Sequence, residues 1–170
     1  MKKRLIFGTA NLGFNNYGIS SNASRSMSED ILDTCISLNI KDVDTSPKYG
    51  SSEKIIGTFL KKNKTNLKIH TKLPLPENEI DISCDFFQRY FEKSLYNTNS
   101  NIIEVLYLHN NQIKFLSHPI VNKFMIDLKS KGLVKKIGAT VYTLKELEYT
   151  VKNNFFDVIQ LPLNLANFNI

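Results

Sequence analysis

The sequence predicts an α/β protein built from a parallel repeat of strands and helices. Short apolar segments alternate with longer amphipathic ones along the whole chain. The apolar segments are continuous, which is typical of parallel strands that are buried on both faces. Ionisable side chains stand at or just after the ends of several of these segments, which is where α/β proteins meet their ligands.

The predicted strands are short. They are Leu5 to Phe7, Ile40 to Val43, Leu67 to Ile69, Ile102 to Leu108, Ile137 to Val141 and Val158 to Leu161. Longer segments with helical spacing lie between them, so we interpret the chain as βα units of roughly 30 residues.

The first predicted helices lie on either side of the second strand. Ser26 with Glu29 forms a capping box at the start of one helix. Its core-facing positions are Ile31, Leu32, Cys35, Ile36 and Leu38. The helix over Ser51 to Lys62 places Ile55, Ile56, Phe59 and Leu60 on its buried side.

The later helices carry clearer boundary signals. Asp81 to Tyr96 shows the same periodicity, with five apolar positions: Phe86, Phe87, Tyr90, Phe91 and Leu95. Pro119 near the start of Ile120 to Leu128 and Gly132 after it delimit a further helix. Thr143, with Glu146 three residues later, opens the last one.

Composition favours an ordinary globular protein. The 170 residues are 42% hydrophobic and 22% charged, and no linker or low-complexity tract divides them, so we expect a single domain over residues 1–170. The net charge of +6 comes from scattered lysines, which does not favour nucleic-acid binding. No long apolar stretch indicates a membrane segment, and we expect a cytoplasmic protein.

The two cysteines indicate neither a disulfide framework nor a metal site. Cys35 and Cys84 are far apart and lack the spacing of zinc ligands. We expect two buried free thiols and no bound metal.

The loop after the first strand separates two architectures that use βα repeats. A dinucleotide fold would place GxGxxG there, and a phosphate loop would end in Lys-Ser/Thr. The segment Gly8 to Gly13 does not have the glycine spacing of GxGxxG. Phe14 and Asn15 follow it, where a phosphate loop would have Lys and Ser or Thr. A (β/α) barrel, with functional groups at the ends of several strands, fits better. We count six of its eight strands.

Four side chains of different chemistry are candidates for a carbonyl-reducing site. Tyr49 is the candidate proton donor, and a phenol with an ordinary pKa of about 10 needs help at neutral pH. An ammonium nearby lowers that pKa, and a carboxylate keeps the ammonium charged, which are the roles expected of Lys72 and Asp44. The imidazole of His109 could orient the substrate oxygen or relay a proton.

Each residue alone also has a structural explanation. Asp44 could cap the loop after a strand, Tyr49 could be a turn aromatic, and Lys72 could be a solvated strand-end lysine. For His109 the two interpretations are balanced, whereas His70 and His118 are expected to be structural. The joint pattern favours a site, because chance rarely brings all four types to one rim in successive units.

These residues lie in motifs that resemble a known family. Six segments carry the resemblance: Phe7 to Ala10 with Tyr17-Gly18, Asp44 to Glu53 followed by Ile56-Gly57, Thr71-Lys72, Tyr107 to His109, Gly132 through Thr140, and Val158 to Gln160. Together they are similar to the aldo-keto reductases in order along the whole chain.

The resemblance implies a TIM barrel that uses NADP(H), without metal, to reduce a small-molecule aldehyde or ketone. Tyr49 would be the acid, Lys72 and Asp44 would tune it, and His109 would orient the carbonyl. Thr140 and Gln160 would contact the nicotinamide carboxamide. Thr9 and Ala10 would flank the cofactor, with Asp44 beside them.

The chain also departs from the family pattern. Thr140-Val141 stands where many members have Ser-Asn. Members continue through a seventh and an eighth unit, which supply an aromatic residue that stacks on the nicotinamide and basic residues that hold the adenosine phosphate. The chain ends at Ile170, so the resemblance covers about six of eight units.

Two functions are therefore carried forward. One is an NAD(P)H-dependent oxidoreductase with the roles just described. The other is a non-catalytic, truncated relative or binding module. Because a barrel stopped after six strands leaves parallel edges open, we also expect self-association through the first and sixth strands.

Overall fold

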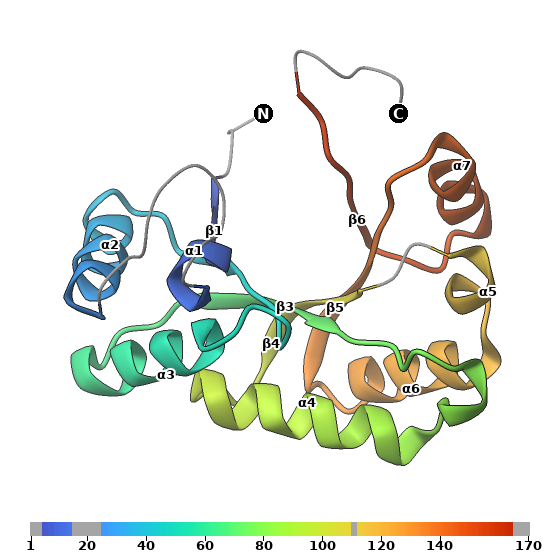
Figure 1. The fold of residues 1–170 in the computed structure, drawn as a ribbon, viewed down its shortest axis with the longest axis horizontal. Coiled ribbons are helices and arrows are strands. Elements are labelled where there is room, and N and C mark those ends of the chain that lie inside the picture. Colours follow the sequence, from blue (N-terminus) through green and yellow to red (C-terminus); the bar gives the residue numbers. More distant parts are fainter. Residues whose placement is uncertain (1–4, 15–24, 110–111, 165–170) are drawn as a thin grey trace. The chain divides into compact units, whose positions relative to one another are not determined.

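The computed structural model describes residues 5–14, 25–109 and 112–164, with the side chains of residues 25 and 26 left aside. Its strands form a 6-stranded sheet in the order β1-β2-β3-β4-β5-β6 (Figure 1). The strands are β1 (Ile6–Gly8), β2 (Asp42–Asp44), β3 (Lys68–Leu73), β4 (Ile103–Leu108), β5 (Val134–Thr140) and β6 (Val158–Gln160). The pairs β1/β2, β2/β3 and β5/β6 are parallel, as predicted.

Helices alternate with these strands. They are α1 (Ala10–Gly13), α2 (Arg25–Ser37), α3 (Ser52–Asn63), α4 (Cys84–Thr98), α5 (Ile113–Leu116), α6 (Pro119–Ser130) and α7 (Leu144–Asn153), with a 3₁₀ turn η1 (Glu79–Asp81). The short elements α1, α5 and η1 were not predicted from the sequence, because a single helical turn shows no periodicity. The capping box predicted at Ser26 falls outside the described side chains.

The chain clusters into two compact units. Unit 1 comprises residues 1–71 and 91–103, and unit 2 comprises residues 72–90 and 104–170. Both are discontinuous in sequence, since β3, α4 and β4 each cross a boundary. That residues 1–170 form a single domain stays a prediction, as does self-association through the terminal strands of the sheet.

Unit 1 has an apolar core and a buried carboxylate. Leu32, Val43, Ile56 and Phe59 are at most 1% exposed. Glu53, on the first turn of α3, is 3% exposed and accepts hydrogen bonds from Thr71 Oγ1 at 2.8 Å and Asn97 Nδ2 at 3.4 Å. A buried carboxylate without partners would be costly, and these bonds supply its partners. They also join α3 to β3 and α4.

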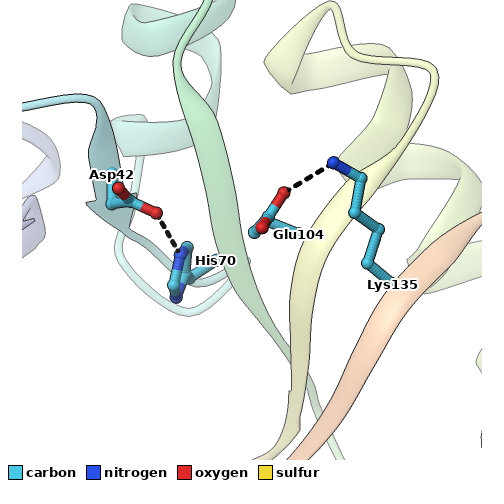
Figure 2. A network of polar contacts seen from close by, with 4 residues as sticks. All are labelled: Asp42, His70, Glu104 and Lys135. Atoms are coloured by element: carbon cyan, nitrogen blue, oxygen red, sulfur yellow. Dashed lines mark hydrogen bonds and ion pairs between the residues drawn. The ribbon is translucent and has the colours of Figure 1, made fainter.

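The strand β3 is longer than the predicted Leu67 to Ile69 because its polar residues are paired rather than solvated. His70 Nε2 lies 3.0 Å from Asp42 Oδ1, and both side chains are almost fully buried (Figure 2). His70 is therefore a buried residue of β3. Polar residues with partners on neighbouring strands continue β3 where hydropathy alone ends it.

Unit 2 is held by α6 against β5 and by paired side chains. Phe87 of α4 and Phe124 of α6 have ring centroids 5.5 Å apart. The Lys135 ammonium lies 2.9 Å from a Glu104 carboxylate oxygen, which joins β5 to β4 (Figure 2).

Two of the helix boundaries predicted in unit 2 are confirmed, the end of α6 and the start of α7. At the end of α6, Gly132 has φ +71, its N–H donates to Lys129 O, and Leu133 N–H donates to Leu128 O. This is the Schellman arrangement. At the start of α7, Thr143 and Glu146 form the complete capping box.

The cysteine prediction was half wrong. Cys35 is buried, and burial raises the pKa of its thiol. Cys84 is exposed. Cys84 is the first residue of α4, which starts there rather than at Asp81: Ser83 Oγ accepts from Phe86 N–H at 3.2 Å and caps the helix.

Within the described residues, no helix is long and apolar enough to cross a membrane. Over the same residues, no group of three or more His, Cys, Asp or Glu side chains is arranged to hold a metal ion.

One ion pair in unit 2 predicts how stability depends on pH. Lys129 Nζ lies 2.8 and 2.6 Å from the two carboxylate oxygens of Asp157, and Ile137 N–H donates to one of them at 2.9 Å. Partial burial raises the pKa of Asp157, but the hydrogen bonds and the charges of Lys129 and Lys136 outweigh it and lower the pKa below 3.8. A carboxyl with a lowered pKa stabilises the fold above its unfolded-state pKa and loses that contribution as the pH falls through the folded value.

We therefore expect Asp157→Asn to lower the melting temperature at about pH 7 and to lower it by less at about pH 3. Thermal melts of both proteins at the two pH values measure this. Asp33→Asn, at an exposed position of α2, is the control and should change little at either pH. An Asp157→Asn effect that does not shrink on acidification would contradict the assignment.

Candidate active site

All the predicted site residues lie at or just beyond the carboxyl ends of strands. Thr9 and Ala10 follow β1, Asp44 ends β2, Tyr49 lies in the turn between β2 and α3, Lys72 is next to last in β3, His109 follows β4, and Thr140 and Gln160 end β5 and β6.

Asp44 and Thr9 are tied together in unit 1. The N–H and the Oγ1 of Thr9 both donate to the carbonyl oxygen of Asp44, each at 2.9 Å. Thr9 is fully buried and Asp44 is half-buried. The register pairs Gly8 with Asp44. These contacts fix the end of β2 relative to the first residues after β1.

Tyr49 is half-buried and sits in a closed turn. Its N–H donates to Ser46 O at 2.9 Å, and its carbonyl oxygen accepts from Ser52 N–H at 3.0 Å. Its ring lies 6.1 Å from the ring of Phe14 at an interplanar angle of 59°. The main chain of Tyr49 is thus bonded on both sides, which limits where the phenol can lie.

The turn is packed directly against α1. A Cβ placed on Gly13 would lie 1.7 Å from Tyr49 O and 2.7 Å from Ser52 N, and one placed on Gly50 would lie 2.2 Å from Gly13 O. Only glycine permits this backbone-to-backbone contact. In the sequence, Gly13 was merely the last residue of a segment that failed to match a phosphate loop, so its role was not foreseen.

Lys72 and His109 belong to unit 2. Lys72 is 3% exposed, so it is not the solvated lysine of the structural explanation. Its Nζ lies 6.0 Å from the centroid of the Tyr107 ring, near the limit of a cation–π contact. His109 is half-buried, and its N–H donates to Leu73 O at 3.0 Å, which holds the residue beside the end of β3.

Thr140 and Gln160 are register partners at the ends of β5 and β6. Thr140 Oγ1 donates to Leu108 O at 2.7 Å, which leaves the lone pairs of the hydroxyl as acceptors. Gln160 Oε1 is buried and has no hydrogen-bond partner among the described residues. A buried acceptor without a partner is uncommon in folded proteins and often marks the place of a bound water or ligand.

The site residues therefore fall into two groups. Thr9, Ala10, Asp44 and Tyr49 belong to unit 1, and Lys72, His109, Thr140 and Gln160 belong to unit 2. Within each group, hydrogen bonds and strand pairing hold the carboxyl ends of neighbouring strands together. That the two groups meet around one ligand stays a prediction.

The sequence missed the residues that support Tyr49. Ser52 is fully buried and contacts Thr9 and Thr45 through its hydroxyl group. In the sequence, Ser52 was only one residue of the motif from Asp44 to Glu53, and no role was assigned to it. Ser51 is the N-cap of α3 but makes no side-chain cap. That the next residue, Ser52, is the buried one is visible only in the tertiary structure.

Comparisons with known proteins point to one family. The model of the Aldo/keto reductase family matches residues 4–169. D-arabinose 1-dehydrogenase of Saccharomyces cerevisiae is 28% identical over 125 residues, which are 68% of this chain and 37% of that protein.

Solved structures show the same fold. A Pseudomonas aeruginosa protein that carries the name of an aldo-keto reductase matches with a TM-score of 0.80 and 24% identity, over 96% of this chain and 64% of its own. The holo form of an aldo-keto reductase of Bacillus halodurans matches with a TM-score of 0.74 and 19% identity, over 94% of this chain and 53% of its own. The prediction of a parallel, TIM-barrel-like fold reduced to about six units is confirmed. The chain spans between about a third and two thirds of the length of these relatives.

Proposed function

Because the chain belongs to the aldo/keto reductase family, we propose that it reduces the carbonyl group of an aldehyde or ketone with NADP(H) as the hydride carrier. The observation that carries the proposal is the placement of a carboxylate, a phenol, an ammonium and an imidazole at the ends of successive parallel strands: Asp44 and Tyr49 after β2, Lys72 in β3 and His109 after β4. In α/β barrels, catalytic residues come from the ends of several strands.

The proposed chemistry balances with one proton and one hydride. A reduced nicotinamide, when bound, would supply the hydride for the carbonyl carbon. The phenol O–H of Tyr49 gives its proton to the carbonyl oxygen as negative charge develops there. Lys72 and Asp44 adjust the acidity of that phenol, and His109 donates a hydrogen bond that orients the carbonyl oxygen.

The residues at the ends of β5 and β6 fit the proposed cofactor. A carboxamide carries two N–H donors, and the Oε1 of Gln160, which has no partner within the described part of the chain, is an acceptor. The hydroxyl of Thr140 offers a further acceptor beside it, since the two residues are register partners. Thr9 and Ala10 would flank the cofactor from the end of β1, with Asp44 beside them.

The yeast relative supports a sugar or another hydroxylated aldehyde as substrate. Its name describes dehydrogenation of D-arabinose at carbon 1, which is a hydride transfer in the oxidative direction on a sugar. We therefore propose that the first assay should measure NADPH oxidation by the purified protein with aldoses and simple aldehydes. Absence of turnover with every carbonyl compound, in a protein that binds NADPH, would contradict the proposed reaction. The cytoplasmic location stays a prediction.

The cofactor assignment predicts opposite effects of one substitution on binding and on stability. Gln160→Met removes the buried acceptor at nearly constant shape. We expect NADPH affinity to fall about three- to tenfold, the value of one net hydrogen bond. The melting temperature without cofactor should hold or rise, because the substitution also removes an unsatisfied polar atom.

Fluorescence titration with NADPH and a thermal melt measure these two quantities. Gln88→Met, at a half-buried position of α4, is the matched control and should leave affinity unchanged. Equal affinities of the wild type and Gln160→Met would remove Gln160 from the cofactor site.

A further inference from the structure

A chain of buried hydroxyl groups joins the start of α3 to the ends of β1 and β2. Ser52 Oγ lies 2.6 Å from Thr9 Oγ1 and 3.0 Å from Thr45 Oγ1. Thr9 Oγ1 in turn lies 2.9 Å from the carbonyl oxygen of Asp44. All three hydroxyl residues are 0% exposed. Without water to compete, hydrogen bonds between such groups are strong, and losing one partner is costly.

The hydrogens of this chain can be assigned, because each hydroxyl has only one. The carbonyl of Asp44 can only accept, so Thr9 donates to it. Ser52 then uses its hydrogen toward Thr9, whose Oγ1 and carbonyl oxygen are both in reach, at 2.6 and 3.0 Å. Thr45 must therefore donate to Ser52. The chain runs from Thr45 through Ser52 and Thr9 to Asp44, with Ser52 in the middle.

The main chain of Ser52 binds Tyr49, the proposed proton donor. Its N–H donates to the carbonyl oxygen of Tyr49 at 3.0 Å. Ser52 thus binds the Tyr49 turn through its backbone, and its hydroxyl contacts Thr9 and Thr45, of which Thr9 donates to Asp44. All these contacts lie within unit 1.

We propose that Ser52 is a positioning residue that sets the placement of Tyr49 relative to Asp44. It acts through the turn and the hydroxyl chain, and it would matter for turnover because misplacing a reacting group by about 1 Å can cost about a hundredfold in rate. The inference rests on the proposed function for its effect on catalysis, but its effect on the Tyr49 turn is independent of it.

The test compares Ser52→Ala with Thr98→Val. Thr98 is also 0% exposed, belongs to the same unit, and donates a hydrogen bond from Oγ1 to Ser94 O at 2.7 Å. Both variants lose a buried hydroxyl, so both should be somewhat destabilised. Only Ser52→Ala should lower kcat for NADPH oxidation, by about ten- to a hundredfold, with KM little changed.

A second readout does not need turnover. In protein labelled with ¹³C at the tyrosine ζ carbon, the Tyr49 resonance is identified by its loss in Tyr49→Phe. We expect Ser52→Ala to shift or broaden this resonance more than those of the other tyrosines, and Thr98→Val to leave it in place. Ser52→Cys, which keeps a side chain at the site with a weaker hydrogen-bonding group, should give a smaller change in the same direction and serves if Ser52→Ala does not fold.

The outcomes separate the two proposals. An unchanged Tyr49 resonance in Ser52→Ala, or an equal change in Thr98→Val, overturns the positioning role whatever the activity. A wild-type protein without turnover overturns the proposed function, while a shifted Tyr49 resonance would still support the role of Ser52 in placing the turn.

Discussion

Tyr49→Phe is expected to lower NADPH oxidation with aldehydes by at least about a hundredfold, the usual contribution of a positioned general acid. The substitution removes the phenol O–H and keeps the ring, which lies 6.1 Å from the ring of Phe14. Affinity for NADPH and thermal stability should therefore be nearly unchanged, and the loss should appear in kcat.

The matched control is Tyr96→Phe. Tyr96 lies on α4 and is 86% exposed, so removing its hydroxyl group should change neither rate nor stability. Steady-state rates of the three proteins over a range of pH measure the effect. Equal rates for the wild type and Tyr49→Phe would refute the assignment of the acid. Cofactor binding without turnover in the wild type would favour the alternative of a non-catalytic binding module.

Gly13→Ala should destabilise the protein by about 2–3 kcal/mol, a typical cost of forcing atoms into a packed site. The added Cβ would lie 1.7 Å from Tyr49 O, and 2.7 Å from Ser52 N. Both neighbours are main-chain atoms, which cannot turn aside as a flexible side chain can. Relief therefore requires α1 and the Tyr49 turn to separate, so the variant should also disturb the position of Tyr49.

Gly8→Ala is the control for this substitution. A Cβ on Gly8 meets nothing within 4 Å. Since alanine also restricts the unfolded chain, Gly8→Ala should be neutral or stabilising by up to about 1 kcal/mol. Urea unfolding of both variants gives the free energies. A Gly13→Ala protein as stable as Gly8→Ala would show that the contact between α1 and the turn is not tight.

The sequence predicted most of the fold because periodicity and caps are local. Each of the predicted strands exists, and the Thr143–Glu146 capping box and the stop at Gly132 form as expected. Boundaries were wrong where tertiary contacts decide them. Hydropathy ends the third strand at Ile69, yet β3 continues to Leu73 because Asp42 pairs with His70 and Glu53 accepts from Thr71.

The start of α4 is a second boundary that was predicted at the wrong residue. The apolar pattern allowed a helix from Asp81, whereas the side chain of Ser83 caps it and starts it at Cys84. A serine that caps and a serine in a preceding loop look alike in the sequence.

By itself the sequence determined the βα repeat, its parallel strands and the candidate residues at their ends, because these depend on residue types a few positions apart. Only the tertiary structure decided how the Tyr49 turn is held. Thr9 and Ser52 are 43 positions apart, and Gly13 touches a turn that begins after another strand. Hydrogen bonds and steric contacts between such distant segments exist only once the chain has folded. Neither hydropathy nor local propensity predicts them.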